Sequence, residues 1–265
     1  MSDRVTITQE DQVAIVTLSR PEKRNALDLA MIEAIVAAGQ ELAKRKDIRA
    51  VVLTGDGEAF CAGLDLAAMP LIAQAALSDG GFTQRTHGDS NLFQAVAMGW
   101  AELPQPVIAA VHGFSFGGGF QLMLGADIRI ADPNTKFSVM EGRWGLVPDM
   151  GGMVLMRRLA REDIIRKITY TAQVFSSEEA LAWGFVTELS DTPLETAKSL
   201  AQEIAGKSPD AVRSAKKLIS DTELTGWHET LIAESKAQEA LVGQKNQMEA
   251  VMAGMQKRPA KFSDE

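Results

Sequence analysis

Two short, uninterrupted apolar segments, each followed by a loop of small residues, constrain the fold of this chain most strongly. Residues 50–54 read Ala-Val-Val-Leu-Thr, and residues 106–111 read Pro-Val-Ile-Ala-Ala-Val. Continuous apolar runs of this length are typical of strands buried on both faces of a parallel sheet. Because parallel strands need crossover connections, usually helices, these runs predict an α/β fold.

The remaining pattern divides the chain into two parts. Strands are expected at Val13–Leu18 and Ile128–Ala131, and a helix is expected at Leu29–Lys46 with Asp28 as its N-cap. From Met150 onward helical periodicity dominates, and helices are expected at Asp163–Thr171, Ser177–Trp183, Leu194–Gly206, Pro209–Ile219 and Glu229–Gln256. We therefore expect an α/β core over residues 1–190, with a mobile or partly helical insert at residues 67–93, and a helical region over residues 191–265.

Composition narrows the class of partner. The 27 Lys and Arg against 35 Asp and Glu give a net charge of −8, which argues against nucleic acid or an anionic membrane as partner. One cysteine and three scattered histidines predict no metal site. Without a signal-peptide pattern or a spanning apolar run, the chain is expected to be soluble and cytoplasmic, and to bind a small molecule.

Two loops of small residues are candidates for a binding or catalytic site. Gly117, Gly118 and Gly119 follow one apolar strand and open a helix, while residues 60–66 follow the other strand. In a parallel sheet both loops emerge at the same edge, so their backbone N–H groups can converge on one carbonyl oxygen and form an oxyanion hole. The glycines can equally serve only to let a helix and a strand pack closely.

The chain resembles the crotonase (enoyl-CoA hydratase/isomerase) superfamily. The resemblance spans nearly the whole chain and is carried by Arg20–Leu27, Phe60–Leu66, Gly113–Gly119 and the tail Gln256–Phe262. It implies a crotonase (ClpP-like) spiral of ββα units with a C-terminal helical trimerisation region, assembled as a homotrimer or a dimer of trimers. It also implies an acyl-CoA thioester substrate, in which coenzyme A is part of the substrate and no separate cofactor is needed.

The resemblance assigns roles to individual residues. The N–H groups of Ala62 and Gly118 are expected to polarise the thioester carbonyl and to stabilise an enolate. Substrate-binding positions are Arg24, Ala26, Gly63, Leu64, Asp65, Leu66, Phe114, Gly117, Gln121 and Lys257. Lys257 is expected to reach coenzyme A from a neighbouring subunit, although Arg24 and Lys257 can also be read as solvated charges.

The acid/base residues separate the reactions of the superfamily. Hydratases resembling this chain carry two glutamates, and here the first position is Gln121 and the second is Glu141. A glutamine side chain can orient water but cannot accept its proton, so hydratase activity is doubtful. A second carboxylate, Asp149, stands eight residues after Glu141, as in family members that shift double bonds. We therefore predict enoyl-CoA isomerisation with Glu141 and Asp149 as proton carriers.

Alternatives remain for the reaction and for single residues. The chain can be an enoyl-CoA hydratase, which is a lyase that adds water to 2-enoyl-CoA, or a non-catalytic acyl-CoA-binding homologue. A dehalogenase with Asp149 as nucleophile is a further alternative. Asp149 can also be the N-cap of a helix beginning at Met150. His112 and Cys61 are expected to be structural, because neither has a partner in sequence that would activate it.

Overall fold

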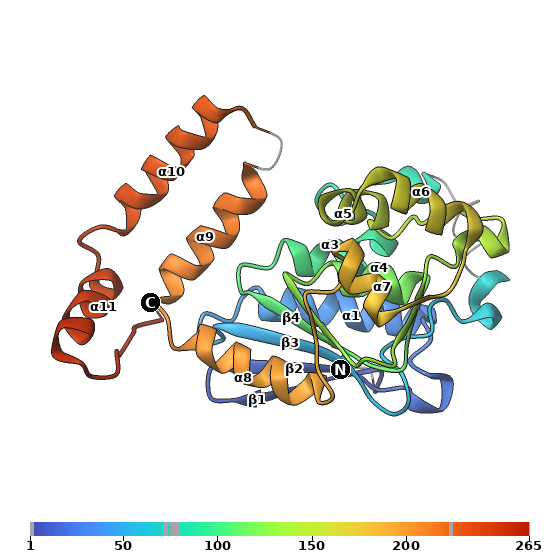
Figure 1. The fold of residues 1–265 in the computed structure, drawn as a ribbon, viewed down its shortest axis with the longest axis horizontal. Helices are drawn as coiled ribbons and strands as arrows, with labels where there is room; N and C mark the ends of the chain where they lie inside the picture. The colour runs from blue at the N-terminus through green and yellow to red at the C-terminus, as the bar shows by residue number, and fades with distance from the viewer. Residues whose placement is uncertain (1–2, 71–73, 75–79, 223–224, 265) are drawn as a thin grey trace.

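A computed structural model of the chain describes residues 3–70, 74, 80–222 and 225–264 (Figure 1). Its main sheet has six strands. In spatial order they are β1 (Val5–Glu10), β2 (Val13–Leu18), β3 (Ala50–Gly55), β4 (Val107–Val111), β6 (Ile128–Ala131) and β9 (Glu188–Leu189). β1 pairs antiparallel with β2, and every other neighbouring pair is parallel. The α/β class predicted from the two apolar runs is confirmed.

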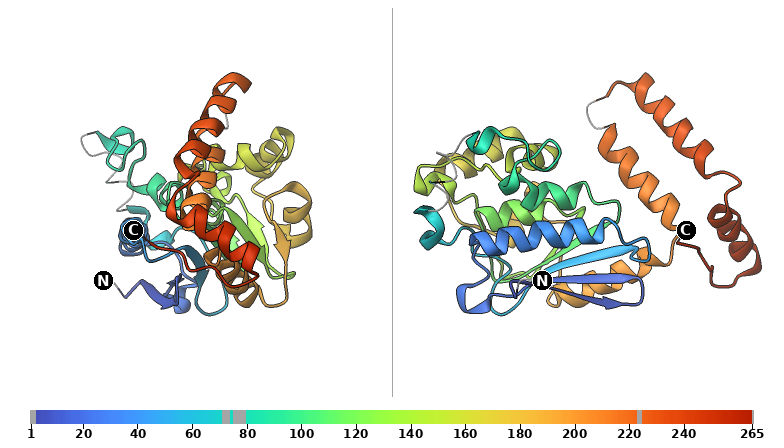
Figure 2. Two further views of the ribbon diagram at one scale, coloured as in Figure 1. Left: turned by 90° about the vertical axis from the view of Figure 1, so that its left-hand side faces the viewer. Right: turned by 180° about the vertical axis from the view of Figure 1, so that it is seen from behind.

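Helices cover both faces of this sheet. On one face, Ala197, Ala201 and Ala205 of α8 (Pro193–Ala205) pack on alternate strand residues such as Val52 and Ala110. On the other face lie α1 (Leu29–Leu42), α3 (Leu92–Ala101) and α4 (Gly118–Leu124). Comparison of Figure 1 with the rear view in Figure 2 shows α8 and α1 on opposite sides. Burial on both faces explains why β3 and β4 are apolar throughout.

The structure contains a second, smaller sheet. It consists of β5 (Phe114–Phe116), β7 (Lys136–Ser138) and β8 (Phe175–Ser176). β4 leads directly into β5 and α4, and β6 leads into β7. The 3-10 helix η4 (Glu141–Trp144) and helices α5 (Gly152–Leu159) and α6 (Glu162–Thr171) follow β7, and α7 (Ser177–Trp183) connects β8 to β9. The repeated order of strand, strand and helix is the expected ββα arrangement.

Most element predictions hold, with differences at the ends. Asp28 caps α1 by accepting a hydrogen bond from the Met31 N–H at 2.8 Å, but the helix ends at Leu42, before Lys46. The long helix predicted to end at Gln256 is two helices, separated near Gly243, whose φ of +76° is not helical. The edge strand β1 escaped prediction because its outward side is polar and exposed. The predicted insert contains the 3-10 turns η2 (Leu66–Ala68) and η3 (Gly81–Thr83); residues 71–73 and 75–79 lie outside the described residues.

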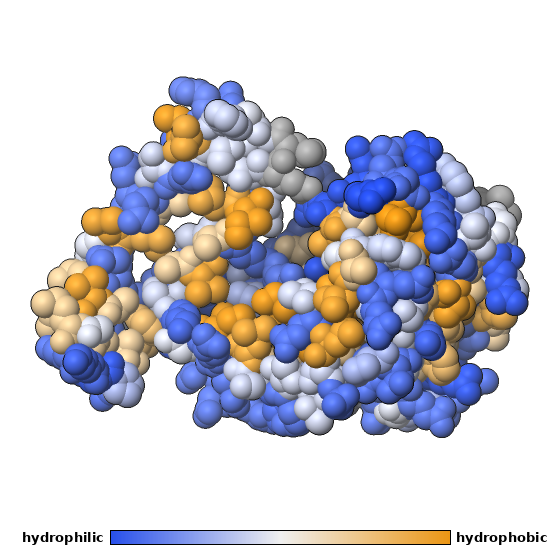
Figure 3. All heavy atoms as spheres, in the orientation of Figure 1, coloured by the Kyte–Doolittle hydropathy of each residue, from blue (hydrophilic) through white to orange (hydrophobic). Residues whose placement is uncertain are grey.

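The last three helices extend away from the α/β body (Figures 1 and 2). They are α9 (Pro209–Asp221), α10 (Trp227–Leu241) and α11 (Lys245–Gln256). Because α8 packs on the sheet, the projecting region begins after α8 and not at residue 191. Apolar side chains gather on this region (Figure 3); Trp227 is 90% exposed, and the others are Ile219, Leu231, Ile232, Val242, Met248, Val251, Met252 and Met255. Within the described residues, no helix is both long enough and apolar enough to cross a membrane.

Candidate active site

The loop after β3 lies between β5 and the segment around Arg24. The Cys61 N–H donates to the Phe114 carbonyl at 3.0 Å, and the Ala62 N–H donates to the Arg24 carbonyl at 2.9 Å. A backbone N–H engaged in this way is not available to a substrate oxygen. The assignment of Ala62 as an oxyanion donor is therefore wrong, because the fold itself uses its N–H.

Leu64 supplies the free N–H in this loop. The Gly63 carbonyl accepts from the Leu27 N–H at 2.8 Å, and the peptide bonds of the described chain are trans. In a trans peptide the C=O and the following N–H point in opposite directions, so the Leu64 N–H points away from Leu27. No hydrogen bond from this N–H is found within the described residues. Gly63, with φ of +87°, permits this change of direction.

The second donor is the first residue of α4. The Gly117 carbonyl accepts from the Gln121 N–H at 3.0 Å, so the Gly118 N–H points out of the start of the helix. The two loops are in close contact, since a Cβ added to Gly63 would lie 3.7 Å from the Gly117 Cα. The N–H groups of Leu64 and Gly118 thus belong to two loops that are in contact, and both can donate to one oxyanion.

Glu141 stands at the start of η4, beside the triple-glycine loop. The residue is 9% exposed, and a Cβ at Gly117 would lie 3.4 Å from its Oε1 atom. Gln121 Nε2 donates to Oε1 at 2.6 Å, while Oε2 is buried without a partner in the described part of the chain. Burial raises the pKa of the Glu141 carboxyl above its usual range, and the nearby charge of Asp149 raises it further. Such a carboxylate is a stronger base than one in water.

Gln121 lies beside Glu141, and its amide is hydrogen-bonded within the protein. Its side chain is fully buried, and its Oε1 accepts from the Met150 N–H at 2.8 Å and the Gly152 N–H at 2.9 Å. The predicted contact between Gln121 and substrate is therefore not supported, because the amide is held by the protein.

Asp149 lies on the loop that Gln121 holds. The residue is exposed, yet the protein around the carboxyl desolvates it enough to raise its pKa. α5 begins only at Gly152, after Gly151 with φ of +86°, and none of the described side chains caps it. The alternative that Asp149 is an N-cap is therefore wrong, and the carboxylate is not used by the helix.

A family model described as enoyl-CoA hydratase/isomerase matches residues 8–265. The chain belongs to the enoyl-CoA hydratase/isomerase family. It is 34% identical over 227 residues to a carnitinyl-CoA dehydratase of Salmonella typhi, covering 84% of this chain and 82% of the relative. It is also similar to an enoyl-CoA hydratase structure from Bacillus anthracis, with TM-score 0.87 and 29% identity over 99% of this chain and 100% of that one. An enoyl-CoA hydratase structure from Polaromonas sp. JS666 has TM-score 0.86 and 27% identity, covering 98% and 99%.

The matches confirm the predicted crotonase fold, and the chain is an acyl-CoA enzyme of the hydratase/isomerase type.

The other binding positions carried over from the family differ in how far the protein itself engages them. Asp65 pairs with Arg20 at 2.8 Å and accepts from the Ala67 N–H, and these hydrogen bonds lower the pKa of its carboxyl. Its side chain therefore holds the loop together, and its backbone is engaged as well, because the Asp65 N–H donates to the Leu27 carbonyl at 3.0 Å and the Asp65 carbonyl accepts from the Ala68 N–H at 2.8 Å.

The remaining predicted binding residues lie at three places. Arg24, with φ of +50°, places its guanidinium 5.7 Å from the ring centre of Phe114. Ala26 is buried at the end of the same segment, and Leu66 is exposed at the start of η2. Lys257 ends α11 on the projecting region, whereas the other positions lie in the α/β body (Figure 1). Arg24, Ala26 and Leu66 therefore lie near the two loops, whereas Lys257 of the same chain lies away from them.

The structural interpretations of Cys61 and His112 are confirmed. Cys61 is buried, its Sγ donates to the Asn25 carbonyl at 3.1 Å, and burial raises the pKa of the thiol to about 12. A thiol with that pKa remains protonated near neutral pH and is a poor nucleophile. His112 Nε2 lies 3.0 Å from the Gly57 carbonyl oxygen, within the loop after β3.

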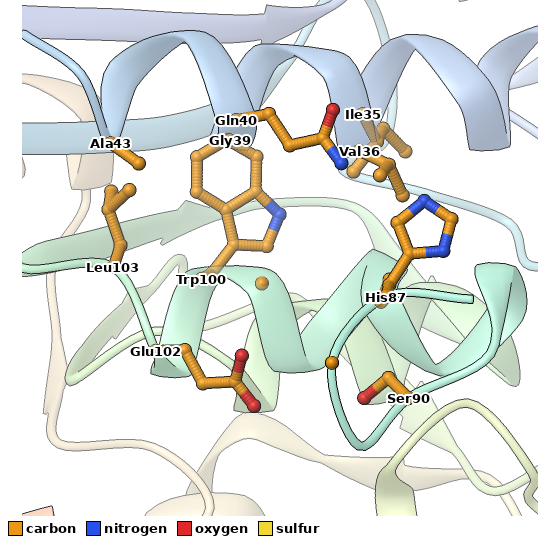
Figure 4. Close-up of a pocket in the computed structure, with 13 residues that line it drawn as sticks. Ile35, Val36, Gly39, Gln40, Ala43, His87, Ser90, Trp100, Glu102 and Leu103 are labelled. Atoms are coloured by element: carbon orange, nitrogen blue, oxygen red, sulfur yellow. The ribbon is translucent and has the colours of Figure 1, made fainter. Parts of the chain in front are cut away.

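A cavity of about 330 Å³ lies between α1 and α3 (Figure 4). Trp100 extends from α3 toward α1, and Glu102 also lines the cavity. Burial raises the pKa of the Glu102 carboxyl, with a smaller contribution from the charge of Asp89. None of the predicted catalytic or binding residues lines this cavity, so it is separate from the family site. Among the described residues there is also no group of three side chains that could hold a metal ion.

Proposed function

We propose that this enzyme moves the double bond of an enoyl-CoA, with Glu141 as the base that carries the proton. The observation that carries the proposal is the state of the two positions beside the triple-glycine loop. Glu141 is a desolvated carboxyl group, one oxygen of which has no hydrogen-bond partner among the described residues, whereas Gln121 is neutral and held by three hydrogen bonds. One base suffices to shift a double bond along one face of a substrate.

The proposed reaction begins at the thioester. The carbonyl oxygen of a 3-enoyl-CoA accepts from the N–H groups of Leu64 and Gly118, and Glu141 removes a proton from C2. The electron pair moves into a dienolate whose oxygen carries the negative charge. Return of the proton to C4, by Glu141 or Asp149, yields the conjugated 2-enoyl-CoA with no change in composition. A single donor in such a hole contributes roughly 3 kcal/mol to the transition state.

Addition or removal of water is the second candidate. It is favoured by the names of the relatives, a carnitinyl-CoA dehydratase and two enoyl-CoA hydratases. With Gln121 neutral, this reaction would need Glu141 and Asp149 as its acid and base. Both carboxyl groups have raised pKa values, so either can hold a proton closer to neutral pH than a solvated carboxyl does.

The products distinguish the two reactions. The enzyme is incubated separately with a 3-enoyl-CoA and a 2-enoyl-CoA, and the product masses are recorded. The proposal expects the 3-enoyl substrate to become its conjugated isomer without a change of mass. A product heavier by one water from the 2-enoyl substrate, with no isomerisation of the 3-enoyl substrate, would establish the lyase instead. No reaction of either substrate would point to a binding protein or another thioester.

Asp149→Asn is expected to lower turnover about 10- to 100-fold, because the variant removes one of the two groups that exchange protons with the substrate. The substitution keeps the size of the side chain and removes its charge. We expect KM to change little, and kcat with the accepted substrate is the measurement. A variant with the turnover of the parent enzyme would show that Glu141 carries the proton alone.

We also propose that α9, α10 and α11 mediate assembly into a homotrimer or a dimer of trimers. Their exposed apolar side chains support this, because a face such as that around Trp227 is costly in water. In such an assembly Lys257 of one subunit can approach the coenzyme A bound by another.

A further inference from the structure

The hydrogen bonds of Gln121 join two parts of the site that are distant in sequence. Gln121 is on α4, and Glu141 begins η4 after β7. Met150 lies just before α5, and Gly152 is the first residue of α5. The buried Gln121 amide is hydrogen-bonded to Glu141 at 2.6 Å, to the Met150 N–H at 2.8 Å and to the Gly152 N–H at 2.9 Å. We propose that Gln121 is a positioning residue, which fixes the Glu141 carboxylate beside the triple-glycine loop and ties it to the loop that bears Asp149. This inference deepens the proposed function and rests on Glu141 being the base.

The surroundings determine the orientation of the amide. Two backbone N–H groups, from Met150 and Gly152, point at one end of the side chain, and only an oxygen can accept both. The NH2 group must then face Glu141, where it donates to Oε1. A carboxylate is the partner that such a donor stabilises best. The loop backbone thus dictates that Gln121 presents a donor to the catalytic carboxylate.

This donor opposes the effect of burial. Burial and the charge of Asp149 raise the pKa of Glu141, whereas the hydrogen bond from Gln121 lowers it. The packed elements also carry other charged groups; they are Arg143 on η4, Arg157 and Arg158 on α5, and Glu162, Asp163, Arg166 and Lys167 on α6. α4 carries none, and Asp149 is the charged group whose field acts on Glu141 in the described chain. The hydrogen bond from Gln121 therefore favours the ionised form of this buried carboxyl group.

Little space is left for another side chain at this point. A Cβ at Gly152 would lie 2.5 Å from the Gln121 Oε1, so the backbone of the loop is packed directly on the amide. A glutamate at position 121 could still accept from both N–H groups but would bring a negative charge to the place of the donor. A methionine would fill the same volume with neither donor nor acceptor. The two variants separate the charge at this position from its hydrogen bonds.

The test measures the pH dependence of kcat for Gln121→Glu and Gln121→Met. We expect the acid limb of Gln121→Glu to move upward by about one pH unit, because a like charge replaces a donor. Gln121→Met should lose about 100-fold in kcat at neutral pH, because the base and the loop are displaced, and its acid limb should also move upward. KM should change little in both. If Gln121→Glu does not fold, the acid limb of Gln121→Met decides.

Gln105→Met is the matched control. Gln105 is also buried, and its amide donates to the carbonyls of Leu42 and Arg45, away from Glu141. This variant should lose stability but keep kcat and the acid limb. A folded Gln121 variant whose acid limb stays at the value of the parent enzyme would overturn the proposal, even if kcat falls, because that result would indicate a purely structural role.

A second readout separates this inference from the proposed function. Exchange of the C2 protons of a saturated acyl-CoA with D2O, followed by mass spectrometry, reports enolate formation with no need for a double-bond shift. If the parent enzyme exchanges these protons but does not isomerise a 3-enoyl-CoA, the proposed function fails and the Gln121 variants are compared by exchange. Exchange that is unaffected in both folded variants would overturn the role of Gln121.

Discussion

Glu141→Gln is expected to lower kcat about 1,000-fold, because it removes the carboxylate that we propose as the base. The variant keeps the shape of the side chain, and its amide oxygen can still accept from Gln121 Nε2. In the parent enzyme this nitrogen lies 2.6 Å from the Glu141 Oε1. We expect KM and the affinity for a saturated acyl-CoA to change little. Steady-state kinetics and calorimetric binding provide the two measurements.

Glu102→Gln is the control for this prediction. Glu102 is also a carboxylate whose pKa is raised by burial, but it lies at the cavity between α1 and α3. Its replacement should leave kcat unchanged. If Glu141→Gln keeps more than about a tenth of the activity, another group must carry the proton.

The same substitution should also change stability with pH. The pKa of Glu141 is raised in the folded protein, so the folded state binds this proton more tightly than the unfolded state does. Its contribution to stability is present below the pKa of the unfolded chain and is lost as the pH rises through the folded pKa. We therefore expect the Tm of Glu141→Gln relative to the parent enzyme to increase between pH 4 and pH 8. A constant difference in Tm would contradict the raised pKa.

Gly119→Ala is expected to lower kcat at least 100-fold and to destabilise the fold by about 2 kcal/mol. An added Cβ would lie 2.5 Å from the Cys61 carbonyl oxygen and 2.7 Å from the Cys61 Cβ. Both contacts are too short, so the loop after β3 must move away from α4. This movement separates the N–H groups of Leu64 and Gly118. Kinetics and thermal unfolding of the purified variant provide the measurements.

Gly99→Ala is the matched control for the glycine substitution. Gly99 is inside α3, and outside the neighbouring turns of this helix no heavy atom of the described residues lies within 4 Å of a Cβ added there. Alanine favours a helix over glycine by about 1 kcal/mol, so this variant should be slightly more stable and fully active. If both variants behave alike, the contact between Cys61 and Gly119 does not position the donors.

The parts of the fold that depend on local pattern were predictable. The apolar runs at β3 and β4, the helical spacing of α1 and the cap at Asp28 act over a few residues, and each is found as expected. Errors arise where the local signal is weak. The polar outer side of β1 hides its strand pattern, and Gly243 divides a helical pattern that otherwise continues to Gln256.

At the site, the chemical groups that are present were predictable from the residue types alone. The triple glycine, the glutamine at position 121 and the carboxylates at 141 and 149 follow from the residue types and their family-like spacing. That is enough to predict a loop that binds a carbonyl oxygen, and to cast doubt on a pair of glutamates acting on water.

How these groups are used depends on contacts between segments that are distant in the sequence. Ala62 and Leu64 both have backbone N–H groups, and the pairing of this loop with Arg24 and Leu27 occupies the first and frees the second. Likewise, the contacts of Gln121 with Glu141 and with the loop before α5 join segments 20 to 31 residues apart. Each donor or acceptor is satisfied by whichever group the fold brings to it, and pairing between distant segments leaves no local pattern in the sequence.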